Sequence, residues 1–353
     1  LLCDFIVSTY CEDISDRVAR FASPAVLVSA IACGLMTYFM SVSNYVMYNV
    51  SLAVGAATAV LAVGATFSGA LVVMLPMLTA SKTLAAKNAA VLGYSAIEDV
   101  NETNAVLIEA KSLFPANSVK VNNIWDYNKN GTKGTQHIQI DDAIIYAASL
   151  AVSSDSVLAD AFFNMLNYKP SLLKQVSNCV YESNLGVMGW IGSRRVLLGN
   201  REHMKSHGVA VPEAKKEAAV NKHHDEVVYL AVAGEVCMLF FVELTANTQI
   251  KQHVQNLCAN GVSLVVKTVD GMITEGMLSE LFDISPENVR VIPYEAHAEF
   301  DERTKFVPNG SAAVSCDGTF SSLAAAINGS KCIHKKVKLG CAVQIAGLTL
   351  GIL

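Results

Sequence analysis

The stretch "AVLIEAKSLFP", residues 105–115, indicates the fold class of the chain. Its apolar run, residues 106–108, has the composition of a buried β-strand, and it leads directly to the carboxylate of Glu109. Open α/β sheets keep their reactive groups at the carboxyl ends of their strands. The stretch therefore predicts a strand of an α/β sheet, with Glu109 at the edge where a site would lie.

The last third of the chain continues this α/β pattern. The predicted elements are two strands within 228–243 joined at Gly234, a helix at 247–261, a buried strand at 262–270, a helix at 273–282, a strand at 289–292, a strand at 312–317 and a helix from about 321. Thr268, Asp270 and Asp317 follow strand ends as Glu109 does, so we expect the four side chains at one edge of the sheet.

Residues 116–226 interrupt this pattern and predict an inserted domain. A loop-rich stretch, "WDYNKNGTKGTQ", precedes two predicted helices at 141–151 and 155–166. A strand region punctuated by glycines follows, "ESNLGVMGWIGSRRVLLGNREHM" at 182–204.

The N-terminal part predicts a membrane hairpin. The 353 residues are 52% hydrophobic and 16% charged, against about 25% charged in an average soluble protein. No Asp, Glu, Lys, Arg or His occurs from Phe21 to Ser81, which is room for two spans of roughly 20 residues each. Basic residues flank both ends of this run, so both ends are expected on the cytoplasmic side, with helices at 24–41 and 50–80. A buried helical hairpin in a soluble protein is the alternative.

Three further features of the composition bear on the class of protein. The apolar run at 339–353 is too short to span a membrane comfortably, and the start without Met leads us to expect a fragment cut at both ends. The nine cysteines form no C-x-x-C pair, which predicts reduced thiols. The net charge of −5 indicates no nucleic-acid partner.

The order of these parts resembles the P-type ATPases, most closely their heavy-metal (copper, cadmium and zinc) branch. The segments that carry the resemblance are 12–32, 69–100, 185–209, "ANGVSLVVKTVD" at 259–270 and "SCDGTFSSLAAAI" at 315–327. It implies a membrane α-helical hairpin plus a cytoplasmic α/β part, in which a haloacid-dehalogenase-like Rossmannoid phosphorylation domain carries an inserted α+β nucleotide-binding domain.

The resemblance also implies domain limits. They are 1–20 for the end of an actuator-domain linker, 21–94 for two transmembrane helices with a cytoplasmic extension, 95–115 and 236–338 for the phosphorylation domain, 116–235 for the nucleotide-binding domain, and 339–353 for the start of the next transmembrane helix.

The family's phosphorylation signature, Asp-Lys-Thr-Gly-Thr, matches residues 109–113, and none of its residues is kept. The extra methylene of Glu109 would displace the attacking oxygen, and a misplacement of about 1 Å can cost on the order of 10²-fold in rate. Glu109 is interpreted as a relic carboxylate, with a working nucleophile as the alternative.

The two later signatures are also degraded. Thr-Gly-Asp is represented by Thr268, Val269 and Asp270, which indicates either a residual anion site or an ordinary polar strand end. Gly-Asp-Gly-x-Asn-Asp is represented by 316–321, where Asp317 could still hold Mg²⁺ but the Asn-Asp pair is lost. Phosphoryl transfer depends on positioning and charge neutralisation, and few of those groups remain.

The ligand motifs outside the phosphorylation domain are partly kept. In the nucleotide-binding domain the family's His-Pro is replaced by Ser156 and Val157. The residues that match the glycine-rich nucleotide motif are Gly186, Gly189, Gly192 and Asn200. Glycines let backbone approach a ligand but also serve tight turns, so nucleotide binding and a retained scaffold both stay open.

In the membrane the family's Cys-Pro-Cys is replaced by Leu75, Pro76 and Met77. Pro76 is expected to break its helix and free backbone carbonyls. Met74 and Met77 could offer thioethers to a soft ion, although a methionine in an apolar helix usually serves packing. His223 and His224 lie in a charged connector and are interpreted as solvated surface.

These losses, on a retained scaffold, indicate a P-type ATPase-like pseudoenzyme with a regulatory or scaffolding role. Two alternatives stay open: an active, divergent cation-transporting ATPase that uses Glu109 and Asp317, and a membrane-anchored nucleotide-sensing module. The resemblance implies ATP and Mg²⁺ as ligands, and a lipid membrane and an unidentified protein as partners. It implies an integral protein of the plasma membrane with residues 82–338 on the cytoplasmic side.

Overall fold

The computed structural model describes residues 14–44, 49–65, 69–127, 138–182, 184–221, 225–305 and 313–352. The chain divides into two compact units. The helical unit comprises Leu1–Thr103 and Pro308–Leu353, and the α/β unit comprises Asn104–Val307.

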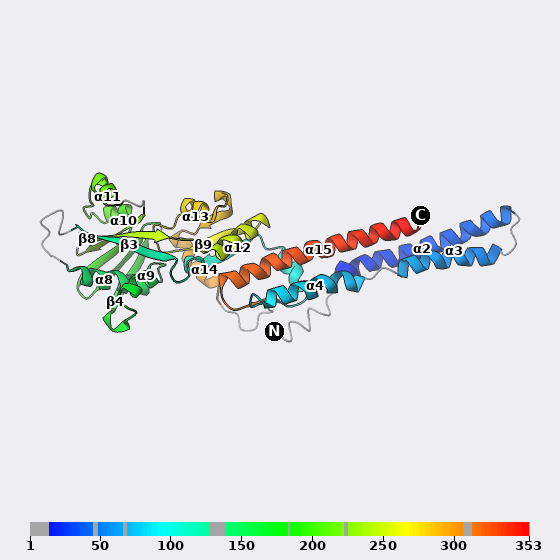
Figure 1. Ribbon diagram of the computed structural model, residues 1–353, viewed down its shortest axis with the longest axis horizontal. Coiled ribbons are helices and arrows are strands. Elements are labelled where there is room, and N and C mark those ends of the chain that lie inside the picture. The colour runs from blue at the N-terminus through cyan, green and yellow to red at the C-terminus, as the bar shows by residue number, and fades with distance from the viewer. Residues whose placement is uncertain are drawn as a thin grey trace. The chain divides into compact units, whose positions relative to one another are not determined.

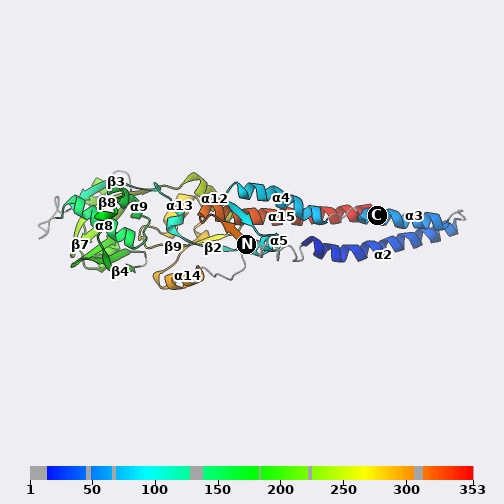
Figure 2. The same cartoon turned by 90° about the horizontal axis from the view of Figure 1, so that it is seen from below.

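The helical unit is built from long helices and one small sheet. Its helices are α2 (Ile14–Ser43), α3 (Asn49–Ala65), α4 (Gly69–Ala85), α5 (Tyr94–Asn101) and α15 (Phe320–Ile352). Strands β1 (Ala89–Val91) and β11 (Val314–Cys316) pair antiparallel. Helix α2 lies beside α3, and α15 lies beside α4 (Figures 1 and 2). Buried side chains from α4, α5 and α15 form one apolar core.

The structure describes the predicted second helix at 50–80 in two parts. These are α3 and α4, and residues 66–68 between them lie outside the described part. Of the described helices, α2 alone is long and apolar enough to cross a membrane, over Asp16–Ser43, whereas Val50–Gly64 and Leu71–Ala85 are shorter apolar helices. The structure therefore contains one long apolar helix rather than a clear membrane hairpin.

One further expectation for this unit is corrected. Helix α4 continues through Pro76, because a proline removes only one helical hydrogen bond and α4 packs along α15. The helix predicted from about 321 is present as α15, which begins at Phe320 and extends through the apolar run at 339–353 to Ile352.

The α/β unit contains a three-stranded parallel sheet in the order β10-β9-β2. Its strands are β2 (Ala105–Glu109), β9 (Ser263–Lys267) and β10 (Val289–Val291). The short helix α6 (Ala110–Leu113) follows β2 directly, and the other helices of this part are α12 (Thr248–Ala259), α13 (Glu275–Phe282) and α14 (His297–Arg303). Figure 2 shows β2 beside β9, with Glu109 opposite Lys267 in the strand register.

The inserted segment forms a six-stranded antiparallel sheet in the order β3-β8-β7-β6-β5-β4. This sheet extends through β8 to Leu244, beyond the predicted limits at 226 and 235, because β8 pairs with β3 and β7 rather than with the parallel strands. The strands are β3 (Val119–Asp126), β4 (Val176–Glu182), β5 (Gly186–Ile191), β6 (Arg194–Gly199), β7 (Glu226–Val232) and β8 (Glu235–Leu244). Helices α8 (Ile140–Ser153) and α9 (Ala159–Met165) cover one face, and α10 (Arg201–Ser206) and α11 (Ala214–Val220) cover the other (Figure 1).

Side chains that alternate along the central strands fill both faces of this sheet. Tyr229, Leu239 and Phe241 belong to the apolar core on the α10 side. Phe240 points to the opposite face, where its ring lies 4.8 Å from that of Phe162 in an edge-to-face contact. A strand buried on both faces explains the continuous apolar sequence of β8.

Most predicted elements of the last third are confirmed. Strands β7 and β8 are joined by Ala233 and Gly234, whose positive φ angles suit the tight turn of a two-residue hairpin. The strand predicted at 312–317 is present as β11, but it pairs with β1 in the helical unit rather than with the three-stranded parallel sheet. The loop around 128–137 and the pair His223–His224 lie outside the described residues.

Candidate functional site

A cavity of about 150 Å³ lies at the carboxyl ends of β2 and β9. Both strands run parallel, so Glu109 at the end of β2 and Thr268 just after β9 reach the same edge of the sheet. Three of the four predicted catalytic residues, Glu109, Thr268 and Asp270, line this cavity. The structure thus brings these three together.

The two lysines of the cavity are already paired with carboxylates of the same chain. Lys111 Nζ lies 2.6 Å from Asp155 Oδ1. Lys267 pairs with Asp301 on α14, and its ammonium also lies 5.3 Å from the centre of the Phe300 ring. The positive charges of both lysines are therefore neutralised by carboxylates of the same lining.

Asp270 is buried and holds the loop after β9 against the turn before α9. Its Oδ1 accepts a hydrogen bond from the Ser156 hydroxyl, and its Oδ2 accepts one from the Val157 backbone N–H at 2.9 Å. Burial raises the pKa of Asp270, and these two hydrogen bonds offset only part of the shift. The Asp270 backbone N–H donates to Thr268 Oγ1 at 3.1 Å, so this hydroxyl belongs to the same turn. Both residues serve the packing of the loop.

Glu109 is exposed at the mouth of the cavity, next to the ion pair of Lys111 with Asp155. Its backbone conformation is extended, and it directly precedes α6. His297 also lines the cavity, and burial, and next the charge of Lys267, lower its pKa. The lining therefore combines four carboxylates, two paired ammonium groups and one imidazole.

The glycine-rich segment packs tightly against the loop at 268–272. A Cβ added at Gly186 would lie 2.4 Å from the Leu198 carbonyl oxygen, and one added at Gly271 would lie 2.2 Å from the Leu185 carbonyl oxygen. Asn200 donates to the carbonyl oxygens of Asn184 at 2.7 Å and of Gly271 at 3.3 Å, and it caps α10 by accepting from the His203 N–H. The remaining hollow has about 10 Å³, at most the space of one water molecule.

The other two glycines have structural places as well. Gly189 faces Leu150 and Val176 beneath α8, where an added Cβ would lie under 3 Å from both side chains. Gly192 has a φ of +62° in the two-residue turn between β5 and β6. Each position that matches the nucleotide motif is therefore explained by close packing, a turn or a helix cap.

Asp317 belongs to the helical unit and lies just before α15. Its Oδ1 accepts from the Thr319 N–H at 3.0 Å, the Thr319 hydroxyl at 2.7 Å and the Ser322 hydroxyl at 2.5 Å, while Oδ2 accepts from Asn88 Nδ2 at 3.1 Å. Hydrogen bonds from Ser322 and Thr319 lower the pKa of Asp317 well below its usual range. This carboxylate serves as the N-terminal anchor of α15.

The two methionines predicted for a membrane ion differ in their surroundings. Met77 packs against the core of α4, α5 and α15, whereas Met74 is exposed on α4. Packing accounts for Met77.

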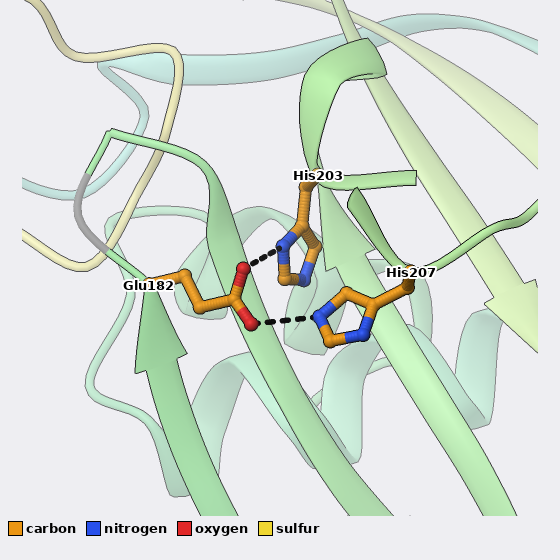
Figure 3. Close-up of side chains that lie close together, drawn as sticks. All are labelled: Glu182, His203 and His207. Carbon is orange, nitrogen blue, oxygen red and sulfur yellow. Dashed lines mark hydrogen bonds and ion pairs between the residues drawn. The ribbon is translucent and has the colours of Figure 1, made fainter. Parts of the chain in front are cut away.

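One cluster was missed by the sequence analysis. Glu182, His203 and His207 offer ligand atoms that all lie within 4.8 Å of one another (Figure 3). The sequence signal for it was present in "HMKSH", where two histidines four residues apart fall on one side of a helix. The partner Glu182 could not be found in that way, because β4 meets α10 only in the folded sheet.

Comparison with known proteins found no matching family model and no matching curated protein. Among solved structures, the chain is similar to a zinc-transporting PIB-type ATPase, at 15% identity over 99% of this chain and 59% of that chain, with a TM-score of 0.43. The catalytic domain of the CPx-ATPase CopB-B matches at 13% identity over 63% of this chain and 75% of that chain, with a TM-score of 0.38. The N-domain of HMA6, a copper-transporting P-type ATPase, matches at 15% identity over 36% of this chain and 99% of that chain, with a TM-score of 0.28. The chain spans about three-fifths of the length of the zinc-transporting ATPase, and these similarities are structural, at low sequence identity.

Proposed function

We propose that the chain is a P-type ATPase-like membrane protein that does not transfer phosphate and acts in a regulatory or scaffolding role. The observation that carries this proposal is the double hydrogen bond to Asp270. Through these bonds the buried Asp270 carboxylate, a retained residue of the Thr-Gly-Asp motif, joins the loop after β9 to the turn before α9.

The charges of the cavity support the proposal. Catalysis of phosphoryl transfer rests on positioning and on positive charge placed around the phosphoryl oxygens. Here Lys111 and Lys267 are held by Asp155 and Asp301, and Glu109 adds a further negative charge. An incoming phosphoryl group would meet a lining with more carboxylates than ammonium groups.

The packing of the glycine-rich segment argues against ATP as a ligand. Small-molecule sites usually enclose several hundred Å³. The space beside Gly186 and Asn200 has about 10 Å³, and the loop at 268–272 occupies the place in front of it. ATP does not fit in this space, which supports a scaffold role for Gly186 and Asn200. Gly192 lines a separate, open hollow of about 640 Å³.

Mg²⁺ fits Asp317 poorly for a similar reason. Mg²⁺ needs oxygen ligands with free lone pairs in near-octahedral geometry. Four hydrogen bonds already reach the two oxygens of Asp317, and three of them come from the first turn of α15 and the residues before it. Binding a metal there would release the anchor of α15.

The exposed surface of α2 supports a membrane location. Only 22% of its most apolar window is buried. Leu27, Ile31, Leu35 and Phe39 recur every four residues along α2, and each is more than half exposed. Such an apolar stripe suits contact with lipid, so it supports an integral membrane protein. We further propose that residues 82–338 lie on the cytoplasmic side and that the partner is a protein of unknown identity.

The test is ATP-dependent formation of an acyl phosphate on the full chain, purified in detergent, with Mg²⁺ and a panel of soft metal ions. Wild type and Glu109→Ala are compared after far-UV circular dichroism shows that both are folded. We expect no hydroxylamine-labile phosphate on either. A hydroxylamine-labile phosphate that forms on wild type but not on Glu109→Ala would overturn the proposal and favour a divergent cation-transporting ATPase. The cavity that Glu109, Thr268 and Lys267 share is the observation that supports this alternative.

The membrane part has its own test. Membranes from cells that produce the chain are washed with alkaline carbonate, which strips peripheral proteins. We expect the chain to stay in the pellet, because α2 buries its exposed apolar side chains in lipid. Release into the supernatant would show that α2 does not anchor the chain.

A further inference from the structure

Glu182, His203 and His207 form a compact group on the inserted domain, apart from the cavity at the sheet edge. Glu182 is the last residue of β4, His203 lies in α10, and His207 follows the end of α10. Glu182 Oε2 lies 3.3 Å from His203 Nδ1, and Glu182 Oε1 lies 2.7 Å from His207 Nε2 (Figure 3). The two imidazole rings meet edge to face, with 5.0 Å between their centres.

The surroundings of His203 are unusual for a histidine without a ligand. Its side chain is fully buried. Each of its two nitrogens faces an acceptor, Nδ1 the carboxylate of Glu182 at 3.3 Å and Nε2 the carbonyl oxygen of Val187 at 3.4 Å.

In either tautomer of an uncharged imidazole, one nitrogen has a lone pair, and here that lone pair would face an acceptor. If Nε2 carries the proton and donates to Val187, the lone pair of Nδ1 faces a carboxylate oxygen at 3.3 Å. A cation between these two acceptors would turn the repulsion into two bonds. Histidines that bind metals commonly donate their second N–H to a backbone carbonyl, as Nε2 is placed to do here.

The distances suit a tetrahedral ion. Bonds of about 2.0–2.1 Å to nitrogen and oxygen place two tetrahedral ligands about 3.3 Å apart. The separation of His203 Nδ1 and Glu182 Oε2 already has this value. The contact between His207 Nε2 and Glu182 is shorter by about 0.6 Å than that spacing, and rotation of the exposed end of either side chain can open it.

We propose that Glu182, His203 and His207 bind one divalent transition-metal ion, for which Zn²⁺ is the best match. Two imidazoles and one carboxylate form a ligand set that zinc accepts, with a fourth position for water. The side chains of His207 and Glu182 are 17% and 29% exposed, so solvent can reach that fourth position. Ca²⁺ and Mg²⁺ are disfavoured, because they prefer oxygen ligands.

The competing explanation is a salt bridge without metal. The contact of His207 Nε2 with Glu182 Oε1 at 2.7 Å fits such a pair, and this accounts for His207. It leaves the buried ring of His203 between two acceptors. The metal accounts for all three side chains at once.

Such an ion would join β4 to α10 within the inserted domain. Asn200, the cap of α10, also donates to the Gly271 carbonyl oxygen in the loop after β9. Metal binding at His203 would therefore stiffen the helix whose cap contacts that loop. This gives the site a structural or regulatory effect that does not depend on ATP turnover.

The experiment measures Zn²⁺ and Co²⁺ binding to the tag-free full chain in detergent, in wild type, His207→Asn, Glu182→Gln and the control His253→Asn. His253 lies in α12 of the same unit, outside the cluster. We expect saturable binding of one ion in wild type and His253→Asn, and at least about a tenfold loss of affinity in each of the other two. The Co²⁺ spectrum should show d–d bands of a four-coordinate nitrogen and oxygen site, without thiolate charge-transfer absorption.

His207→Asn and Glu182→Gln change partly exposed groups and introduce no larger side chain, so folding should survive, and circular dichroism checks it. Equal affinity in all four proteins, no saturable binding, or a Co²⁺ spectrum dominated by thiolate bands would overturn the proposal. If one of the two variants unfolds, the other decides the result. The outcome is independent of acyl-phosphate formation, because that assay needs neither of these histidines.

Discussion

Val157 donates its backbone N–H to the carboxylate of Asp270 at 2.9 Å across 113 residues of sequence. Ser156, the preceding residue, donates its hydroxyl to the other oxygen of the same carboxylate. One turn of the inserted domain thus satisfies both oxygens of a carboxylate from the loop after β9. This link makes Asp270 a structural residue, and its energetics can be tested.

Asp270 should make stability depend on pH. Its folded-state pKa is raised above the ordinary value of 3.8, so the folded protein binds the proton more tightly than the unfolded chain. The resulting stabilisation is fully present below about pH 4 and is lost as the pH rises through the raised pKa. Asp270→Asn should remove this loss, so its free energy of unfolding should fall less than that of wild type between about pH 4 and about pH 8.

Urea unfolding followed by tryptophan fluorescence measures this difference, because Trp125 and Trp190 both lie in the six-stranded sheet. The control is Asp283→Asn, which changes an exposed carboxylate. Its free energy of unfolding should depend on pH as that of wild type does. Parallel pH profiles for wild type and Asp270→Asn would contradict the burial of a tightly proton-binding carboxylate.

Freeing the two lysines of the cavity should create an anion site. The double variant Asp155→Asn with Asp301→Asn removes the partners of Lys111 and Lys267. A unit charge about 4 Å away is worth about 1 kcal/mol in water, so affinity for inorganic phosphate should rise at least about fivefold and weaken with added salt. Calorimetric titration with phosphate measures it.

The matched control for this gain is Glu302→Gln, which neutralises the exposed neighbour of Asp301 on α14 and leaves both ion pairs in place. An unchanged phosphate affinity in the double variant would mean that the ion pairs are not what keeps the cavity from binding anions.

Gly271→Ala should disrupt the contact between the loop after β9 and the glycine-rich segment. The new Cβ would lie 2.2 Å from the Leu185 carbonyl oxygen, which is backbone and cannot rotate away. Overpacking of this kind typically costs about 1–3 kcal/mol. In the control Gly276→Ala, on α13, the nearest neighbour of the new Cβ lies 4.0 Å away, so this change should instead stabilise by up to about 1 kcal/mol. Urea midpoints that move in the same direction for both variants would refute the close approach.

Glu217→Gln should weaken the anchor of α11. Glu217 Oε2 accepts from Arg201 Nη2 at 2.7 Å and from the hydroxyl of the buried Tyr229. Because Arg201 and Glu217 are only 26% and 19% exposed, loss of this charged partner should cost about 1–3 kcal/mol in the free energy of unfolding. Glu202→Gln breaks an exposed pair with Lys205 and should cost less than about 0.5 kcal/mol. Equal losses of unfolding free energy in the two variants would mean that the lower exposure of the Arg201–Glu217 pair does not increase its contribution to stability.

The α/β part of the fold could be predicted from the sequence because its signals are local. Period-two and continuous apolar runs predicted β2, β7, β8, β9 and β10, and the hairpin glycine at 234 marked the turn between two of them. The parallel register of β2 and β9 then brings Glu109 and Thr268 to one edge, as the strand ends predicted.

The order of residues along the chain was enough to predict that Glu109 and Thr268 follow strand ends, and that a segment interrupts the sheet between β2 and β9. The predicted end of that segment at 226 is too early, since its antiparallel sheet continues through β8 to Leu244. What those side chains touch became visible in the folded structure. The bonds of Asp270 to Ser156 and Val157, the pairing of Lys267 with Asp301 and the approach of Glu182 to two histidines all join segments far apart in the chain. Periodicity reports the neighbours of a residue along one element, whereas contacts between elements depend on how those elements pack.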